Sequence, residues 1–282
     1  RWALPGWIFG TSERSIYMAM CSLFIDRDSV LLVNSYGDSG NWGNYSIGPA
    51  SDMLSEAGFE VVGVHDGREA TIDSWRRLVM SGPRADVLFL NSSGTPARLN
   101  MAEGTSGSTR DVPSLSRPLA LHMIHSYSLF APDSLTTIGA KWLDRGVYAY
   151  VGSCDEPYLP AFVPPSVVVG RIINFAPFLA SSRRDAGPLS LPWRVVAIGD
   201  PLMLIAPPDR RPRMRIGAAV PEVEGMVDVR RVALERLDGV VEEDDGIAAA
   251  DTLRDLYLLG QDELAAKLWA KMQENDLSLI HI

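Results

Sequence analysis

The sequence has few of the residues that mark several classes of protein. Its two cysteines, Cys21 and Cys154, cannot build the disulfide framework of a small secreted domain. Together with four histidines they do not follow the spacing of a zinc site, and no glycine-rich loop is followed by Lys-Ser/Thr. No run of 18 apolar residues occurs. We therefore expect no metal, no cofactor and no membrane span.

Positive charge is also scarce. The chain carries 26 basic and 35 acidic side chains, which gives a formal net charge of −9 at pH 7. Its one basic cluster lies among prolines, an arrangement typical of a linker, and comprises Arg210, Arg211, Arg213 and Arg215. Proteins that bind nucleic acid present a basic surface to the phosphate backbone, so nucleic acid is not an expected partner.

Apolar residues, in contrast, are present in the amounts that a globular core requires. They make up 46% of the chain, against 22% of charged residues. Apolar runs of strand length alternate with amphipathic stretches of helix length, which predicts a three-layer α/β domain with a parallel sheet. The predicted strands are 29–36, 60–66, 86–91, 119–124, 147–152 and 193–199, and the predicted helices between them are 49–57, 71–80, 132–145 and 167–181.

Composition divides the chain into five predicted regions. They are an N-terminal segment at 1–27, the α/β domain at 28–206, a Pro/Arg-rich linker at 207–224, a small all-α region at 225–276, and a tail at 277–282. The N-terminal segment has two open interpretations, a strand that forms a hairpin with the first strand of the sheet and the tail of an upstream domain.

The all-α region and the two ends of the sequence carry further interpretations. Helical periodicity predicts two helices, at 247–259 and 262–274, which resemble the start of tetratricopeptide-like repeats. The sequence begins at Arg1 without a methionine, so we interpret it as a fragment of a larger protein. Its last six residues (LSLIHI) match the translation of a common sequencing-adaptor end and are interpreted as an artefact.

Polar side chains follow three of the predicted strands directly. Ligands of open parallel sheets bind beyond the carboxyl ends of the strands, so these residues are the candidates for a ligand cleft. The candidates are Ser92 and Ser93 after the third strand, His125 and Ser126 after the fourth, and Ser153, Cys154, Asp155 and Glu156 after the fifth. The long Gly/Ser/Thr-rich connection at 92–118 is predicted to be functional or flexible.

Three motifs give the α/β domain a resemblance to a known family. The last strand runs into Gly199-Asp200-Pro201, the segment VYAYVGSCDEPY occupies 147–158, and Ser93 and His125 end consecutive strands 32 residues apart. This pattern resembles the gingipain-like cysteine peptidases of the caspase clan. In that family one strand ends in His-Gly and the next in Ala-Cys, about thirty residues later, and the His activates the Cys.

The residues at these two positions differ from those of the family. Ser93-Gly94 stands at the His-Gly position, and Ile124-His125 stands at the Ala-Cys position. The resemblance therefore implies a catalytically degenerate module that binds or scaffolds an unknown protein or peptide within a larger bacterial protein. It also implies an extracytoplasmic or secreted location, which is usual for gingipain-like proteins.

Two catalytic alternatives stay open. In the first, His125 is the base and Cys154 the nucleophile, since each ends a strand and they lie 29 residues apart. The chain would then be an active cysteine-type endopeptidase. In the second, the imidazole of His125 activates the hydroxyl of Ser93, an arrangement that also needs an oxyanion hole and an orienting acid.

Overall fold

The computed structural model describes most of the α/β domain and some residues of the C-terminal region. The described residues are 12–36, 40–80, 82–184, 194–210, 249, 251–253, 256 and 262–274. Contacts within the chain divide it into two units, Arg1–Pro212 and Arg213–Ile282, and each unit is considered by itself.

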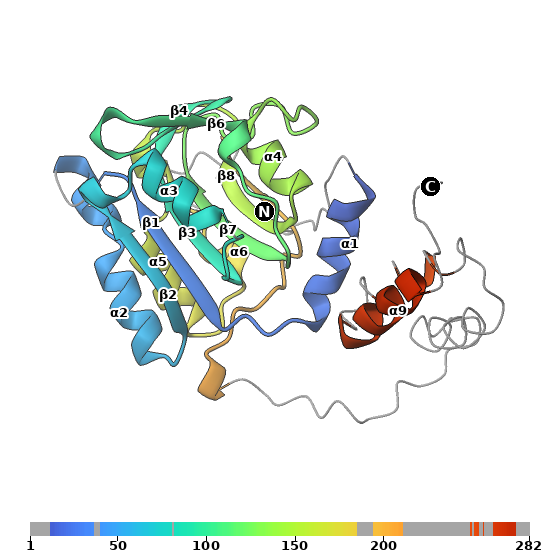
Figure 1. The fold of residues 1–282 in the computed structure, drawn as a ribbon. Helices are drawn as coiled ribbons and strands as arrows, with labels where there is room; N and C mark the ends of the chain where they lie inside the picture. Colours follow the sequence, from blue (N-terminus) through green and yellow to red (C-terminus); the bar gives the residue numbers. More distant parts are fainter. Residues whose placement is uncertain are drawn as a thin grey trace. The chain divides into compact units, whose positions relative to one another are not determined.

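The first unit is built on a six-stranded sheet with the order β2-β1-β3-β7-β8-β9 (Figure 1). The strands are β1 Ser29–Asn34, β2 Glu60–Asp66, β3 Val87–Asn91, β7 Leu119–Ile124, β8 Val147–Ser153 and β9 Val195–Ile198. Every residue of β1, β3, β7 and β8 is buried, because helices cover both faces of the sheet. The mixed α/β fold and the predicted strands are thereby confirmed.

The direction of the last strand differs from the expectation. All neighbouring pairs are parallel except β8 and β9, which pair antiparallel with Ser153 opposite Val195. The chain thus re-enters the sheet at its carboxyl end after α5 and α6. The sequence pattern could not reveal this, since a short apolar strand shows its burial but not its direction.

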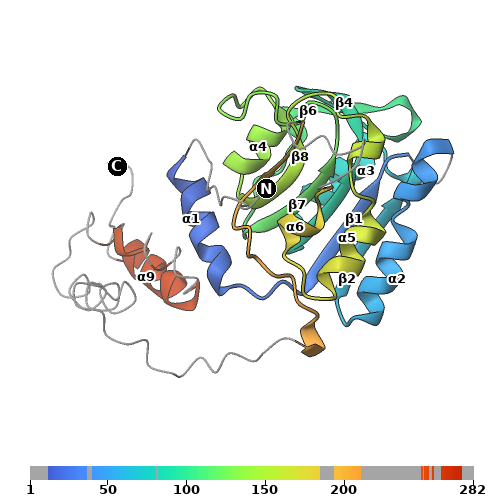
Figure 2. The same cartoon turned by 180° about the vertical axis from the view of Figure 1, so that it is seen from behind.

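Two apolar layers enclose the sheet, one on each face (Figures 1 and 2). One layer holds residues of α3 Ile72–Val79 and α4 Ile138–Asp144, and the other holds residues of α2 Gly48–Glu56, α5 Pro165–Ile172 and α6 Phe178–Ser181. Helices α2 and α3 confirm the predictions for 49–57 and 71–80. Gly58 follows α2 with a φ of +85°, the left-handed conformation common after a helix end.

Three predicted segments are corrected by the structure. The N-terminal segment contains a helix, α1 Glu13–Cys21, and not a hairpin strand; Met18 of α1 packs into the layer that contains α4. The helix expected at 132–145 begins only at Ile138, because the hydroxyls of Ser134 and Thr137 bond locally before it. The helix expected at 167–181 is interrupted before Pro177, as a residue preceding proline disfavours helical geometry.

The long connection at 92–118 folds into a second sheet. It contains three short antiparallel strands, β4 Ser93–Thr95, β5 Arg98–Asn100 and β6 Ser106–Ser108. Leu99 anchors this small sheet in the apolar layer of α3 and α4. Since β4 begins two residues after β3 ends, the small sheet stands at the carboxyl end of the large one (Figure 1).

Short 3-10 turns connect several of these elements. They are η1 Ser22–Phe24, η2 Gly40–Tyr45, η3 Gly67–Glu69, η4 Ala102–Gly104, η5 Thr109–Asp111, η6 Leu159–Ala161 and η7 Pro208–Arg210. The helices among the described residues include none long and apolar enough to cross a membrane.

In the second unit, the described residues contain one complete helix, α9 Asp262–Glu274, where the sequence predicts a helix at 262–274. The all-α region at 225–276 as a whole stays a prediction. Leu268 and Met272 of α9 are buried against Ala249 and Leu256. Most of the first predicted helix at 247–259, residues 211–224 of the predicted linker and the tail at 277–282 lie outside the described residues. The likeness to tetratricopeptide-like repeats stays a prediction.

Candidate functional site

The carboxyl ends of β3, β7 and β8 lie side by side and bring three of the candidate residues into one hydrogen-bonded row. The backbone N–H of Ser92 donates to the carbonyl of Ile124 at 2.9 Å. The hydroxyl of Ser153 donates to the carbonyl oxygen of His125 at 2.5 Å. Ser92, His125 and Ser153 are at most 1% exposed, so this row is closed to solvent.

Both ring nitrogens of His125 have partners. Nε2 lies 3.1 Å from the carbonyl oxygen of Thr95, which can only accept, so the neutral ring carries its proton on Nε2. Nδ1 then accepts from the hydroxyl of Ser92 at 3.0 Å. Burial lowers the pKa of His125 to about 4, and the imidazole is therefore neutral near pH 7.

Strand β4 covers the His125 ring because residue 94 has no side chain. Gly94 has a φ of +151°, and a Cβ built on it would lie 1.8 Å from the carbonyl oxygen of Arg98 and 2.8 Å from Cε1 of His125. Any other residue would push β4 away from both β5 and the imidazole. The close fit of Gly94 is what seals the Ser92–His125 pair.

Ser93 does not meet His125. Its hydroxyl accepts hydrogen bonds from the hydroxyl of Tyr36 and from Nδ2 of Asn100, the latter at 3.3 Å. Tyr36 in turn stacks on Trp42 with ring centroids 3.9 Å apart. The hydroxyl at His125 belongs to Ser92, because successive residues of an extended chain point in opposite directions.

Cys154 does not have the surroundings of an activated thiol. It follows β8, and its backbone N–H donates to the carbonyl of Arg194 at 2.8 Å. Burial raises the pKa of the Cys154 thiol, and the charge of Asp155 acts in the same direction. Reactive cysteines have a lowered pKa, and the two nitrogens of His125 already contact Ser92 and Thr95.

The remaining candidates shape the loops behind β7 and β8. Asp155 accepts from the backbone N–H of Glu156 at 2.8 Å and forms an ion pair with Arg194 at 3.5 Å. Glu156 accepts from the backbone N–H of Tyr158 at 2.9 Å. Its negative charge opposes the fall in the pKa of His125 but is outweighed by burial. Ser126 is half-buried beside His125.

One polar residue at this end of the sheet, Ser128, was not predicted from the sequence. Ser128 accepts from the hydroxyl of Tyr150 at 2.7 Å and from the backbone N–H of Ser153 at 3.1 Å. The signal available was Tyr150 itself, since a tyrosine inside an otherwise apolar strand needs a partner for its hydroxyl. The Ser128–Tyr150 contact ties the loop after β7 to β8.

Aromatic side chains are exposed on these same loops. Phe130 is 61% exposed and Tyr158 is 68% exposed, and Tyr127 lies edge-on to Phe130 with centroids 6.2 Å apart. Tyr127 and Tyr158 have φ values of +58° and +57°, a conformation that non-glycine residues adopt rarely and at a cost of about 1 kcal/mol or more. The backbone of Tyr127 and Tyr158 is thus held in a strained conformation by the structure around it.

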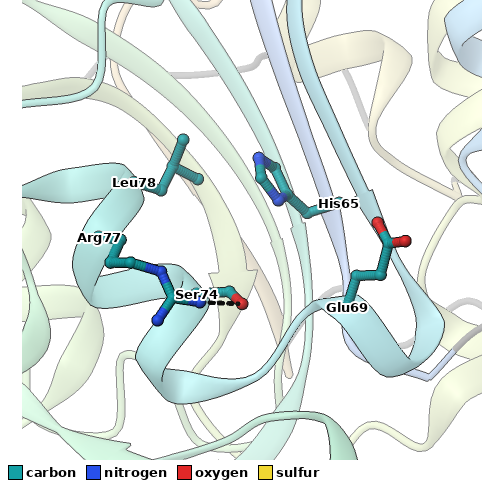
Figure 3. A pocket seen from close by; sticks show the side chains of 5 residues that line it. All are labelled: His65, Glu69, Ser74, Arg77 and Leu78. Atoms are coloured by element: carbon teal, nitrogen blue, oxygen red, sulfur yellow. Dashed lines mark hydrogen bonds between the residues drawn. The ribbon is translucent and has the colours of Figure 1, made fainter.

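A hollow lies elsewhere on the domain, at the end of β2 (Figure 3). It has a volume of about 550 Å³ and is lined by His65, Glu69, Ser74, Arg77 and Leu78. Within the described residues, no three His, Cys, Asp or Glu side chains are grouped so as to hold a metal ion.

Comparison with protein-family models, curated proteins and solved structures finds no match for this chain.

Proposed function

We propose that the α/β domain is a non-catalytic, gingipain-like module that binds a protein or peptide partner. One observation carries this proposal. His125 stands at the position where the family has its nucleophile, yet it is buried, neutral and bonded through both ring nitrogens. A group in this state neither attacks a substrate nor takes a proton from one.

The placement of the strand ends supports the gingipain-like nature of the module. Ser93 and His125, which stand for the family's His and Cys, follow β3 and β7, two neighbouring strands of the sheet. After β9 the chain turns at Gly199-Asp200-Pro201, where Asp200 accepts from the backbone N–H of Leu202 at 2.9 Å. The fold thus keeps the pairing of strand ends that the resemblance implies, with other residues in those places.

Exposed aromatics support the binding role. Phe130 and Tyr158 present apolar rings to solvent at the end of the sheet where this class of fold binds ligands. Aromatic residues supply much of the binding energy at protein interfaces, because they bury a large area with few rotatable bonds. We name this surface, made of Tyr127, Phe130 and Tyr158, the aromatic rim.

Catalysis is tested by labelling the thiol. A Cys21→Ser variant leaves Cys154 as the only cysteine, and its reaction with a peptidyl chloromethyl ketone is compared with its reaction with iodoacetamide. We expect the peptide reagent to give no rate advantage. Labelling accelerated by the peptide, and abolished by His125→Gln, would establish the alternative, a cysteine peptidase that uses His125 and Cys154.

Binding is tested with an array of immobilised extended peptides and the full chain. We expect a subset of peptides to bind, and their affinity to fall at least tenfold in Phe130→Ser and Tyr158→Ser. Phe24→Ser is the matched control, since Phe24 is 87% exposed but lies on η1, away from the aromatic rim. The absence of binding, or an equal loss in the control, would refute a peptide-binding role for the rim.

A further inference from the structure

The hollow at the end of β2 exists because one face of an edge strand is left uncovered. β2 is at the edge of the sheet, and α3 contributes Ser74, Arg77 and Leu78 to one side of the hollow. His65 stands on the other side, and its ring lies close to Gly63: a Cβ built on Gly63 would be 3.4 Å from Nε2 of His65 and 3.1 Å from Cδ1 of Leu31. The hollow belongs to β2, η3 and α3 and is independent of the function proposed above.

Hydrogen-bond donors without acceptors converge on this hollow. Ser74 Oγ accepts from Thr71 Oγ1 at 3.2 Å and from Nη2 of Arg77 at 3.1 Å, so its own proton is available to a further acceptor. Among the described residues, the side chain of Arg77 donates one hydrogen bond, to Ser74. Its other guanidinium N–H groups can therefore donate to a ligand. The imidazole of His65 forms no hydrogen bond or ion pair with any described residue.

The lining of the hollow holds one basic side chain, Arg77, and one acidic side chain, Glu69. In Figure 3 the His65 ring and the Arg77 guanidinium lie on opposite sides of the space, and the carboxylate of Glu69 is turned away from Arg77. Glu69 forms no ion pair with Arg77 among the described residues. The neighbouring Arg68 is paired with Glu103 at 3.5 Å and does not line the hollow.

We infer that this hollow binds a small organic anion. A carboxylate or phosphate group would accept from Arg77, from the Ser74 hydroxyl and from the His65 ring, and a short apolar portion would contact Leu78. The guanidinium fork suits both kinds of oxyanion, and neither requires a metal. The site is open to solvent, so the bare anion is expected to bind with a Kd roughly in the millimolar range.

The test is a titration of the ¹⁵N-labelled full chain followed by NMR, with acetate, hexanoate and inorganic phosphate as separate ligands. We expect saturable shifts at residues 65 and 74–78, and hexanoate to bind about tenfold more tightly than acetate because its chain reaches Leu78. Tighter binding of phosphate than of both carboxylates would assign the site to phosphate groups. Shifts that do not saturate, or that occur elsewhere, would refute the inference.

Three variants separate a built site from general charge attraction. Arg77→Gln is expected to weaken binding at least tenfold, and Arg68→Gln to change it less than twofold, although both remove one positive charge from the same region. Leu78→Ala is expected to remove the preference for hexanoate and leave acetate binding unchanged. Equal losses in Arg77→Gln and Arg68→Gln would leave no specific site and overturn the inference.

Discussion

The two ends of the large sheet are closed by polar networks of opposite character. At the amino end, Asp86 is 2% exposed, and its carboxylate accepts from two backbone N–H groups, from the Ser29 hydroxyl and from Arg117. At the carboxyl end, the neutral imidazole of His125 bonds to Ser92 and Thr95 under β4. The amino end thus holds a carboxylate that several donors compensate, whereas the imidazole at the carboxyl end carries no charge.

This difference bears on function. Chemistry in a parallel α/β fold takes place at the carboxyl end, where it needs ionisable groups that a substrate can reach. In this protein the polar groups Ser92, His125 and Ser153 at the carboxyl end are buried, as Asp86 is at the amino end. We call this buried group at the carboxyl end the junction. The two surfaces proposed above for binding, the aromatic rim and the hollow at β2, both lie outside this junction. The following predictions test whether the junction is structural.

The largest expected effect is a loss of stability on acidification. Burial lowers the pKa values of His122 and His125 to about 4, from an unfolded value near 6.5. Between these values the unfolded chain binds more protons, so the contribution of these two histidines to the free energy of unfolding is constant above pH 6.5 and is lost as the pH falls toward 4. Each histidine contributes roughly 3 kcal/mol to this fall. Urea denaturation between pH 4.5 and 7.5 measures it.

A substitution of His122 separates its contribution to this pH dependence from that of His125. Both nitrogens of His122 are buried without a hydrogen-bond partner among the described residues. His122→Leu should therefore stabilise the protein by about 1 kcal/mol at neutral pH and halve the pH dependence. An unchanged pH profile in this variant would contradict the assignment.

The second effect concerns the amino end. Asp86→Ala removes the acceptor of two backbone N–H groups and of Arg117, and we expect a loss of about 3 kcal/mol in the free energy of unfolding. Ser29→Ala, which deletes a single donor of the same network, should cost about 1 kcal/mol. Chemical denaturation at pH 7 measures both, and equal losses would show that the carboxylate has no special role.

The third effect concerns the cover over His125. Gly94→Ala places a Cβ against the Arg98 carbonyl and the imidazole, and should cost about 2 kcal/mol or more and loosen β4. Gly104→Ala is the matched control, because Gly104 also has a positive φ, +69°, with nothing within 4 Å of its Cβ. We expect about 1 kcal/mol for it. Hydrogen exchange of the amides of β4 and β5 distinguishes loosening of the cover from global destabilisation.

The sequence predicted the large sheet because its central strands are buried on both faces and consist of continuous apolar runs. VLFLN of β3 and LALHMI of β7 are examples. It did not predict that β9 is antiparallel, since burial carries no direction. It also did not predict α1, whose exposed Ile16 and Met20, with Leu23 just after it, made the segment look like a strand of apolar residues.

For the candidate site, the sequence predicted which residues follow the strands, and Ser92, His125 and Ser153 do lie together. It did not reveal that they are buried. The burial of the His125 ring depends on β4, and β4 can cover the imidazole only because residue 94 is a glycine. Such a contact joins residues far apart in sequence and has no periodic signature. Ser92 and Ser93 point in opposite directions, and only this orientation decides that the hydroxyl of Ser92 bonds to His125.

The smallest expected effect decides which serine holds the imidazole. Ser92→Ala leaves the buried Nδ1 of His125 without its donor and should cost about 1 kcal/mol. It should also raise the pKa of His125, because the lost O–H donor stabilised the neutral ring. Ser93→Ala should leave that pKa unchanged, since Ser93 bonds to Tyr36 and Asn100. An NMR titration of the His125 ring protons in the two variants, with urea denaturation at pH 7, measures both effects. A shift in Ser93→Ala and none in Ser92→Ala would reverse the assignment and restore Ser93 as the partner of His125.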